Sequence, residues 1–461
     1  MFDPRQKAKE PFRQQPPERP EMSKRILLGA AAGLAALGVW LLHAQPGHGQ
    51  AEGAAPTATA TPAGPFWPQF NGPRGDNKSP DQGLLKAWPS GGPRLLWTYE
   101  GCGSGFSSVT LAAGMIFTAG DFDNDEKIVA LNSAGQLRWT ALNGKAWKSP
   151  WGGARATPTY SDGMVYHLNA YGRLAAYEAA TGKPVWTFDF PRDGMSQGGF
   201  AESVVIDGNN LICMPGARNE FVMALDKKTG KTVWVSDFKR GDNASYVTPI
   251  IVEHDNRREI IHASLHYLLA LDATTGKVNW YVRHNDVRHC SVVASSPIWD
   301  AGRVFLTLGY GAGSQVFQVD PSGDQATRVW KHDASGSEHG GAILHNGHVY
   351  VAGNYVYPRG TWMEKEAREG KLYCLDFASG QEKWAAPTGR CSLTYSDGRL
   401  YCFNEFGKMY LIEASPDRCK VLGEFIVPKK DKVYTLSHPV VIAGRLYIRH
   451  QNLLYVYDVK G

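Results

Sequence analysis

The stretch LLALDATTGKVNW, residues 268–280, decides the fold of this chain. It opens with an apolar run, turns at Thr275-Gly276 and closes on a tryptophan. Near-copies start at positions 174, 222 and 372, and they read LAAYEAATGKPVW, VMALDKKTGKTVW and LYCLDFASGQEKW. Glycine between two strand-like runs is typical of a β-hairpin, because it adopts the positive φ that such a turn needs. A hairpin repeated this closely indicates a repeat protein.

A second marker gives the number of repeats. Two-residue turns that favour tight hairpins recur 45 to 51 residues apart. Dipeptides such as Asp-Gly and Asn-Gly favour the type I′ turn, whose twist matches a pair of antiparallel strands. There are eight of these turns, at Ala113-Gly114, Asp162-Gly163, Asp207-Gly208, Asp255-Asn256, Ala301-Gly302, Asn346-Gly347, Asp397-Gly398 and Ala443-Gly444.

The tryptophans of the hairpins form a set. In five copies glycine precedes tryptophan by four residues, Trp330 ends a looser copy, and the copy around Val421-Leu422 lacks tryptophan. A tryptophan supplies a wide apolar plate at one position of each unit. We interpret them as structural residues that pack between neighbouring units, namely Trp97, Trp139, Trp186, Trp234, Trp280, Trp330 and Trp384.

The two ends of the chain complete the count. RLLWTYE, residues 94–100, resembles the last strand of a unit, and LLYVYDVKG, residues 453–461, resembles a penultimate strand. If these two strands pair, eight four-stranded units form a ring without open edges. The sequence therefore predicts an all-β, eight-bladed β-propeller of antiparallel blades, closed by pairing of its N- and C-terminal strands.

The N-terminal region is a candidate targeting segment rather than part of the repeat array. Residues 1–51 combine an extension, a basic pair (Lys24 and Arg25) and an apolar run at 26–42, followed by small residues with possible cleavage points after Ala44 or Ala51. This is the pattern of a signal peptide that is cleaved after export, and the competing interpretation is an uncleaved membrane anchor. A start at Met22 would give the segment ordinary signal-peptide proportions. Residues 52–65 form a low-complexity linker, and we expect the propeller to span 66–461.

The charge and the cysteine content indicate which partners and which chemical state of the thiols to expect. The net charge is +5, of which residues 1–25 supply seven Lys/Arg against four Asp/Glu, so the propeller is almost neutral and nucleic acid is not an expected partner. We expect an exported, periplasmic monomer whose contact with a membrane is confined to the N-terminal segment. The seven cysteines are scattered, and the odd number leaves at least one thiol unpaired within the chain.

The hairpin ALDATTGKVNW and its variants resemble the pyrroloquinoline-quinone (PQQ) repeat of quinoprotein alcohol dehydrogenases and of the assembly propeller BamB. The resemblance covers residues 66–461. In the enzymes it implies a quinone held against calcium by carboxylate and amide ligands, an Asp base, a Trp over the ring and a disulfide between adjacent cysteines. This chain has no Cys-Cys pair.

The candidate site lies where the innermost strands begin. In a propeller these strands line the central channel, and the loops that lead into them surround one mouth. Aromatic rings, carboxylates, a guanidinium and imidazoles gathered there could hold a planar anion such as PQQ with calcium, the alternative being an ordinary polar rim. Glu202 beside Trp147 or Trp151 is the best remnant of an enzyme site. The cofactor-binding candidates are Trp147, Trp151, Arg155, Glu202, Tyr246, His289 and His339.

Three other features of the sequence could carry a function. DFDNDE, residues 121–126, spaces its acids like a calcium loop but lacks the glycine and glutamate of that motif, so we expect a solvated turn. Scattered histidines, among them His284 and His438, do not predict a metal site, and no metal is assigned. Residues 354–370 form the longest excursion between strands and suggest a flap or a partner contact.

Two functions compete. The leading expectation is a non-catalytic binding or assembly scaffold in the cell envelope, with a protein or polymer partner. The alternative is a small PQQ- and calcium-dependent alcohol or sugar dehydrogenase. A hydrolase has no nucleophile–base signature in its favour.

Overall fold

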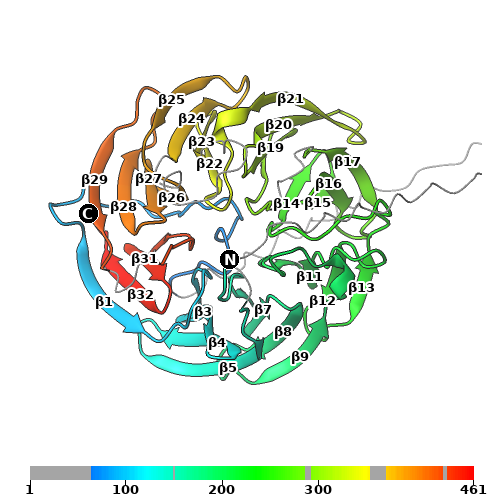
Figure 1. The fold of residues 1–461 in the computed structure, drawn as a ribbon, viewed down its shortest axis with the longest axis horizontal. Coiled ribbons are helices and arrows are strands. Elements are labelled where there is room, and N and C mark those ends of the chain that lie inside the picture. The colour runs from blue at the N-terminus through cyan, green and yellow to red at the C-terminus, as the bar shows by residue number, and fades with distance from the viewer. Residues whose placement is uncertain (1–63, 149–150, 286–291, 354–369, 429–432) are drawn as a thin grey trace, which may run out of the picture. The chain divides into compact units, whose positions relative to one another are not determined.

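The computed structural model describes residues 64–148, 151–285, 292–353, 370–428 and 433–461. They belong to one compact unit, Ala60–Gly461, and form eight four-stranded antiparallel sheets arranged as blades around a ring (Figure 1). The predicted all-β, eight-bladed propeller is confirmed. Within the described ranges no helix is long and apolar enough to cross a membrane. The predicted targeting segment at 26–42 lies outside these ranges, as do His289 and residues 354–369.

Seven blades use four consecutive strands each, with the innermost strand first. The first four blades are β2 (Thr110–Ala112), β3 (Met115–Phe122), β4 (Asp125–Asn132), β5 (Leu137–Lys145); β6 (Thr159–Ser161), β7 (Met164–Leu168), β8 (Arg173–Glu178), β9 (Pro184–Asp189); β10 (Val205–Asp207), β11 (Asn210–Cys213), β12 (Met223–Asp226), β13 (Thr232–Val235); and β14 (Ile250–His254), β15 (Arg257–Ala263), β16 (Tyr267–Asp272), β17 (Val278–Arg283).

The other three are β18 (Ile298–Asp300), β19 (Arg303–Leu308), β20 (Gly313–Val319), β21 (Ala326–His332); β22 (Ala342–His345), β23 (His348–Gly353), β24 (Lys371–Asp376), β25 (Glu382–Ala386); and β26 (Cys391–Ser396), β27 (Arg399–Asn404), β28 (Lys408–Glu413), β29 (Val421–Ile426). Two short 3-10 helices, η1 (Arg192–Gly194) and η2 (Asp333–Ser335), lie in the connections.

The eighth blade closes the ring. It combines β30 (Val440–Ile442), β31 (Arg445–His450) and β32 (Leu453–Asp458) with β1 (Arg94–Glu100) from the other end of the chain, and blue β1 lies beside red β32 in Figure 1. Trp97 pairs with Val456, which confirms the predicted closure. The buried Arg449 guanidinium ties this blade to its neighbour by donating to the carbonyl oxygens of Cys102, Gly103 and Ser107, each at 3.1 Å.

The tight turns follow the predicted type at seven of the eight places. There both central residues have positive φ, as at Asp162 (49°) and Gly163 (78°), and type I′ requires this. The turn at Asp207-Gly208 differs. Asp207 remains in β10 and pairs with Asn210, so the turn residues are Gly208 and Asn209, and of these two only Gly208 has positive φ.

Glycine and tryptophan of the repeat meet across neighbouring blades. Trp139 lies against Gly182 of the next blade, and its Nε1 donates to the carbonyl oxygen of Ala179 at 3.0 Å. A Cβ on Gly182 would lie closer than 3.0 Å to the Trp139 ring, so the position needs glycine for space as well as for its φ of 73°. The same contact joins Trp97 to Gly135, Trp186 to Gly230, Trp234 to Gly276 and Trp330 to Gly380.

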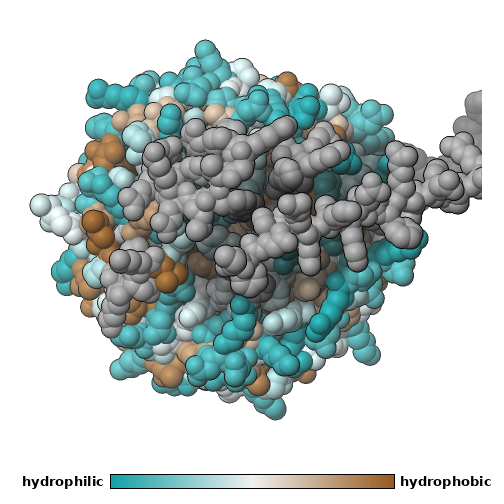
Figure 2. Space-filling view, in the orientation of Figure 1, coloured by the Kyte–Doolittle hydropathy of each residue, from teal (hydrophilic) through white to brown (hydrophobic). Residues whose placement is uncertain are grey.

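The outer strands form the circumference of the ring. They carry single exposed apolar side chains, such as Leu137 on β5, Val185 on β9 and Val233 on β13. Figure 2 shows such hydrophobic residues scattered among hydrophilic ones around the rim. Scattered exposed apolar residues of this kind are normal for a soluble surface.

The segment at 67–85, ahead of β1, runs across inner strands of several blades. Trp67 exchanges backbone hydrogen bonds with Leu111 on β2, and Ser79 N donates to the carbonyl oxygen of Tyr395 on β26 at 2.8 Å. This blue segment reaches the centre of the ring in Figure 1. The inner strands begin after the described candidate residues, which therefore lie in the loops that lead into these strands.

Candidate functional site

Arg155 is the residue that brings the predicted mouth residues together. Its guanidinium lies 5.5 Å from the ring centroid of Trp147, and it donates to the carbonyl oxygen of Trp151 at 2.7 Å and to that of Gly198. The N–H of Gly198 in turn donates to the hydroxyl of Tyr246 at 3.1 Å. Burial lowers the pKa of Arg155. Four of the seven predicted residues therefore form one connected group.

A cavity of about 470 Å³ opens beside this group, a size within the range of small-molecule sites. Trp151 at its edge is 57% exposed and has a φ of 63°. Its ring lies 6.1 Å from that of Tyr434, centroid to centroid. We call this cavity the mouth pocket, and its lining includes Phe106, Asp121, Trp147, Lys148, Trp151, Tyr434 and Gln451.

A carboxylate that we expected to be solvated lies in the mouth pocket. Asp121 at the end of β3 pairs across the hairpin with Glu126 on β4. Burial, followed by the nearby Glu126, raises the pKa of Asp121 to about 7, although the N–H groups of Trp147 and Gly153 oppose the increase. The expectation of a solvated turn is therefore wrong for Asp121, and for Glu126, which is buried 2.9 Å from His167 Nε2. Asp123 and Asp125 are exposed as expected.

The raised pKa of Asp121 predicts a pH-dependent stability. Between about pH 4 and pH 7 the folded state keeps a proton that the unfolded chain has lost, so the free energy of unfolding falls as pH rises. Asp121→Asn removes this loss. We expect the melting temperature of Asp121→Asn, relative to the unchanged protein, to rise from about pH 4.5 to about pH 7 and then to level off. The pKa of Glu405 is also raised to about 7, but it is common to both proteins and cancels. A difference that stays constant across this pH range would contradict the prediction.

Glu202 lies apart from the mouth pocket. The side chain is 2% exposed, one carboxylate oxygen accepts from the backbone N–H of Met214 at 2.9 Å, and the other lies 3.3 Å from His262 Nε2. It is absent from the residues that line the pocket. The position of Glu202 in the sequence correctly predicted that it lies near the start of an inner strand. It did not predict that the side chain points into the blades.

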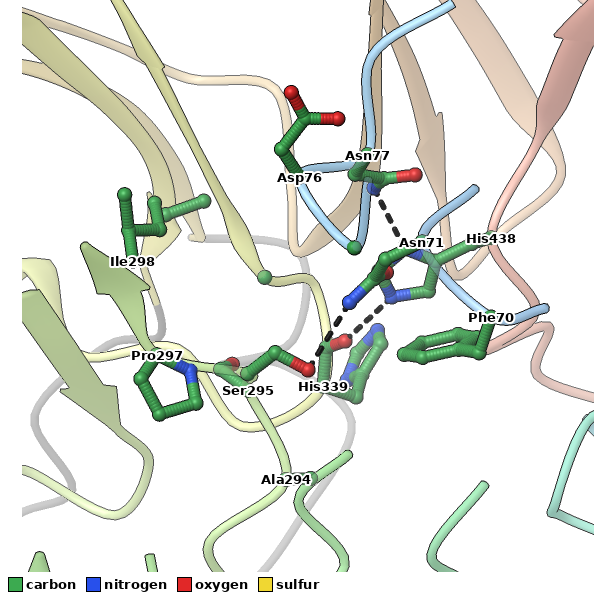
Figure 3. A pocket seen from close by; sticks show the side chains of 14 residues that line it. Phe70, Asn71, Asp76, Asn77, Ala294, Ser295, Pro297, Ile298, His339 and His438 are labelled. Carbon is green, nitrogen blue, oxygen red and sulfur yellow. Dashed lines mark hydrogen bonds between the residues drawn. The ribbon is translucent and has the colours of Figure 1, made fainter. Parts of the chain in front are cut away.

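His339 lines a different cavity, inside the channel, of about 20 Å³ (Figure 3). His438, beside it, donates from Nε2 to the carbonyl oxygen of His339 at 2.8 Å, and its Nδ1 lies 3.1 Å from the amide nitrogen of Asn77. Burial lowers the pKa of His438 to about 4, so the ring is neutral and both nitrogens are engaged. The space is too small for an organic cofactor.

A calcium–quinone site built on Glu202 does not fit these residues. Calcium takes six to eight oxygen ligands, several of them carboxylates. Both oxygens of Glu202 already have partners, and no three His, Cys, Asp or Glu side chains of the described ranges group together. The aromatic rings and Arg155 provide only the part of the expected site that would face a planar anion.

Sequence reasoning missed Asp121, Tyr434 and Gln451 as pocket residues. Asp121 stands on a hairpin between the second and third strands of its blade, whereas the predicted mouth consisted only of loops that enter inner strands. Tyr434 and Gln451 come from the last blade, which meets the first only after ring closure. The hairpins that join the second and third strands of each blade also reach this mouth, and including them would have identified Asp121.

The fold and this site define an eight-bladed β-propeller with an aromatic and acidic pocket at one mouth. The chain belongs to the family described as outer membrane protein assembly factor BamB, whose model matches residues 124–386, more than half of its length. Two solved structures share the fold. BamB from Moraxella catarrhalis has a TM-score of 0.56 at 14% identity, over 79% of this chain and 97% of that one. Quinohemoprotein alcohol dehydrogenase from Comamonas testosteroni has a TM-score of 0.63 at 14% identity, over 86% and 81%.

Curated relatives include proteins with enzyme names. Tetrathionate hydrolase of Acidithiobacillus ferrooxidans is 26% identical over 77% of this chain and 64% of its own length. A quinoprotein alcohol dehydrogenase of Pseudomonas putida is 35% identical over 22% of this chain and 17% of its own. The chain thus spans less than two thirds of these relatives.

Proposed function

We propose that this protein is a non-catalytic binding scaffold of the cell envelope, whose mouth pocket receives a ligand or part of a partner. The observation that carries the proposal is the pocket itself. Trp147 and Trp151 line a cavity of about 470 Å³, whereas the carboxylate expected to hold a cofactor metal is buried elsewhere with its own partners. Concave sites with aromatic walls and a few fixed polar groups are the usual form of a binding site.

Three further features support this reading. The matching family is described as an outer-membrane assembly factor, the role of a scaffold. The apolar run at 26–42 follows a basic pair, as in exported proteins. Arg155 is held by two backbone carbonyls and a tryptophan ring, so it supports the pocket wall and the loop that carries Trp151.

The alternative, a PQQ- and calcium-dependent dehydrogenase, rests on the quinoprotein names among relatives and on the planar shape that Trp147 and Arg155 could accommodate. In such an enzyme the bound quinone would accept electrons from an alcohol. Of this chain's residues, Arg155 would pair with a quinone carboxylate and Trp147 or Trp151 would face the ring.

A titration separates the two functions. We expect calorimetry with PQQ in the presence of calcium to show no binding tighter than about micromolar, and we expect no alcohol-dependent dye reduction. Trp151→Ala is the informative variant, because this exposed ring lines the mouth pocket in which the quinone would lie. Micromolar binding that is lost in Trp151→Ala, together with dye reduction, would overturn the scaffold proposal.

A further inference from the structure

Two polar atoms of the mouth pocket lack protein partners. Asp121 Oδ1 and Trp147 Nε1 are buried and have no hydrogen bond within the described part of the chain. The two residues are adjacent, because the backbone N–H of Trp147 donates to Asp121 Oδ2 at 2.9 Å. An unpaired buried polar group is destabilising, so an acceptor and a donor left unpaired on two contacting residues of one pocket lining indicate a subsite for polar ligand groups. A hydroxyl both donates and accepts, so hydroxyl groups can satisfy atoms of both kinds.

Aromatic rings stand at the edge of the same pocket. Trp151 is the most exposed of them, and its backbone is held in the left-handed region, which is unfavourable for a bulky residue. Such a conformation persists where surrounding structure enforces it, and it is concentrated at binding sites. Together with Tyr434, Trp151 offers flat apolar faces in the pocket that Asp121 and Trp147 also line. A ligand that fits must combine an apolar face with a hydroxyl edge.

The charged groups around Asp121 favour neither a cationic nor an anionic ligand. Glu126 and Asp123 are acids near Asp121. The bases Lys148, Arg155 and Arg449 lie close enough to interact electrostatically with Asp121. Of these groups Asp121, Asp123 and Lys148 line the pocket, and the raised pKa of Asp121 leaves that carboxyl partly protonated near pH 7, so the charges that face a ligand nearly balance. A strongly cationic or anionic ligand would meet like charges on one side, so the balance favours a neutral ligand.

We propose that the mouth pocket binds a sugar ring of an envelope glycan. In this arrangement hydroxyls of the ring meet the Asp121 carboxyl and the Trp147 indole, and the apolar face of the ring lies against Trp151. A pyranose is neutral, has one C–H face and an edge of hydroxyls, and so meets every requirement above. The inference rests on the binding role proposed for the same pocket, and it names the chemistry of the ligand.

The test is calorimetry and saturation-transfer NMR with the full chain and three disaccharides: maltose, cellobiose and N,N′-diacetylchitobiose. Glycerol (hydroxyls without a ring) and cyclohexanol (a ring with one hydroxyl) serve as ligand controls. We expect at least one disaccharide to bind, and Trp151→Ala and Asp121→Ala each to weaken it roughly tenfold or more. Asp125→Asn, on the same hairpin, and Tyr281→Ala, an exposed aromatic on β17, should leave the affinity unchanged. Because Trp151 is exposed, its variant tests the proposal even if Asp121→Ala folds poorly.

Each outcome has a definite meaning. Absence of disaccharide binding up to about 20 mM would overturn the sugar inference, and so would binding that survives Trp151→Ala, or equal binding of glycerol or cyclohexanol. These results would leave the scaffold proposal standing, because that proposal fails only through PQQ binding and dye reduction. The two failures are therefore distinguishable.

Discussion

Deleting β1, Arg94–Glu100, is expected to lower the melting temperature by roughly 10 °C or more, or to prevent accumulation of folded protein. The strand pairs with β32 from Arg94↔Asp458 to Glu100↔Leu453, and Trp97 lies against Gly135 of the next blade. Its loss removes the outer strand of one blade and exposes the edge of β32. An unpaired edge and an uncovered neighbour destabilise the ring at the place where its two ends meet. Thermal unfolding followed by circular dichroism measures the effect.

A cross-link tests the same closure in a protein that folds. Arg94 and Asp458 are directly paired and form an ion pair of 2.7 Å on the surface, so the double variant Arg94→Cys/Asp458→Cys should form a disulfide under mild oxidation. Arg94→Cys/Lys460→Cys, displaced along the C-terminal end, is the matched control and should remain reduced. Equal cross-linking of both pairs would contradict the register, and failure of the first would contradict the closure.

The number of blades could be predicted because two independent markers in the sequence follow the same repeat. Turn dipeptides and Gly–Trp hairpins are local features, and their spacing is independent of how the blades pack. Closure followed from an incomplete unit at each end. The contact of Trp139 with Gly182 could not be predicted from one repeat, because it joins the tryptophan of one blade to the turn glycine of the next. Glycine was therefore explained by its φ alone, although the tryptophan ring also excludes a Cβ there.

The candidate site was predicted in part for a related reason. Topology assigned the loops to one mouth, and there Arg155 contacts Trp147 and Trp151 and is linked through Gly198 to Tyr246. Topology did not predict the direction of a side chain. Glu202 precedes an inner strand, as Arg155 does, yet it turns into the blade, where the N–H of Met214 and the imidazole of His262 satisfy it.

Asp121 presents the opposite case, since an acidic turn that reads as solvated directs its first and last carboxylates inward. Asp121 and Glu126 are cross-strand partners on β3 and β4, so their side chains leave the hairpin on the same face. The exposed residues between them, such as Asp123, dominate the composition of the segment. Hairpin register, which composition does not reveal, separates the buried acids from the solvated ones.

Trp280→Ala is expected to cost about 3–5 kcal/mol of unfolding free energy, the range for truncation of a buried aromatic side chain. Trp280 is 2% exposed and packs in a core with Ala270, its cross-strand partner, and Leu268. Alanine leaves a cavity that the rigid strands of β16 and β17 cannot fill by collapse. Chemical denaturation of the full chain, with the variant and the unchanged protein side by side, measures the loss.

The adjacent residue provides the control. Tyr281 on the same strand is 39% exposed, and its ring makes edge contacts with Phe238 at 5.4 Å, so Tyr281→Ala should cost about 1 kcal/mol. A phenylalanine scan adds a second contrast. Trp139→Phe loses the hydrogen bond to Ala179, whereas Trp280 Nε1 has no partner in the described ranges, so Trp280→Phe loses none. A Tyr281→Ala loss as large as that of Trp280→Ala would place the stabilising face of β17 outward and contradict the role of these tryptophans as packed plates.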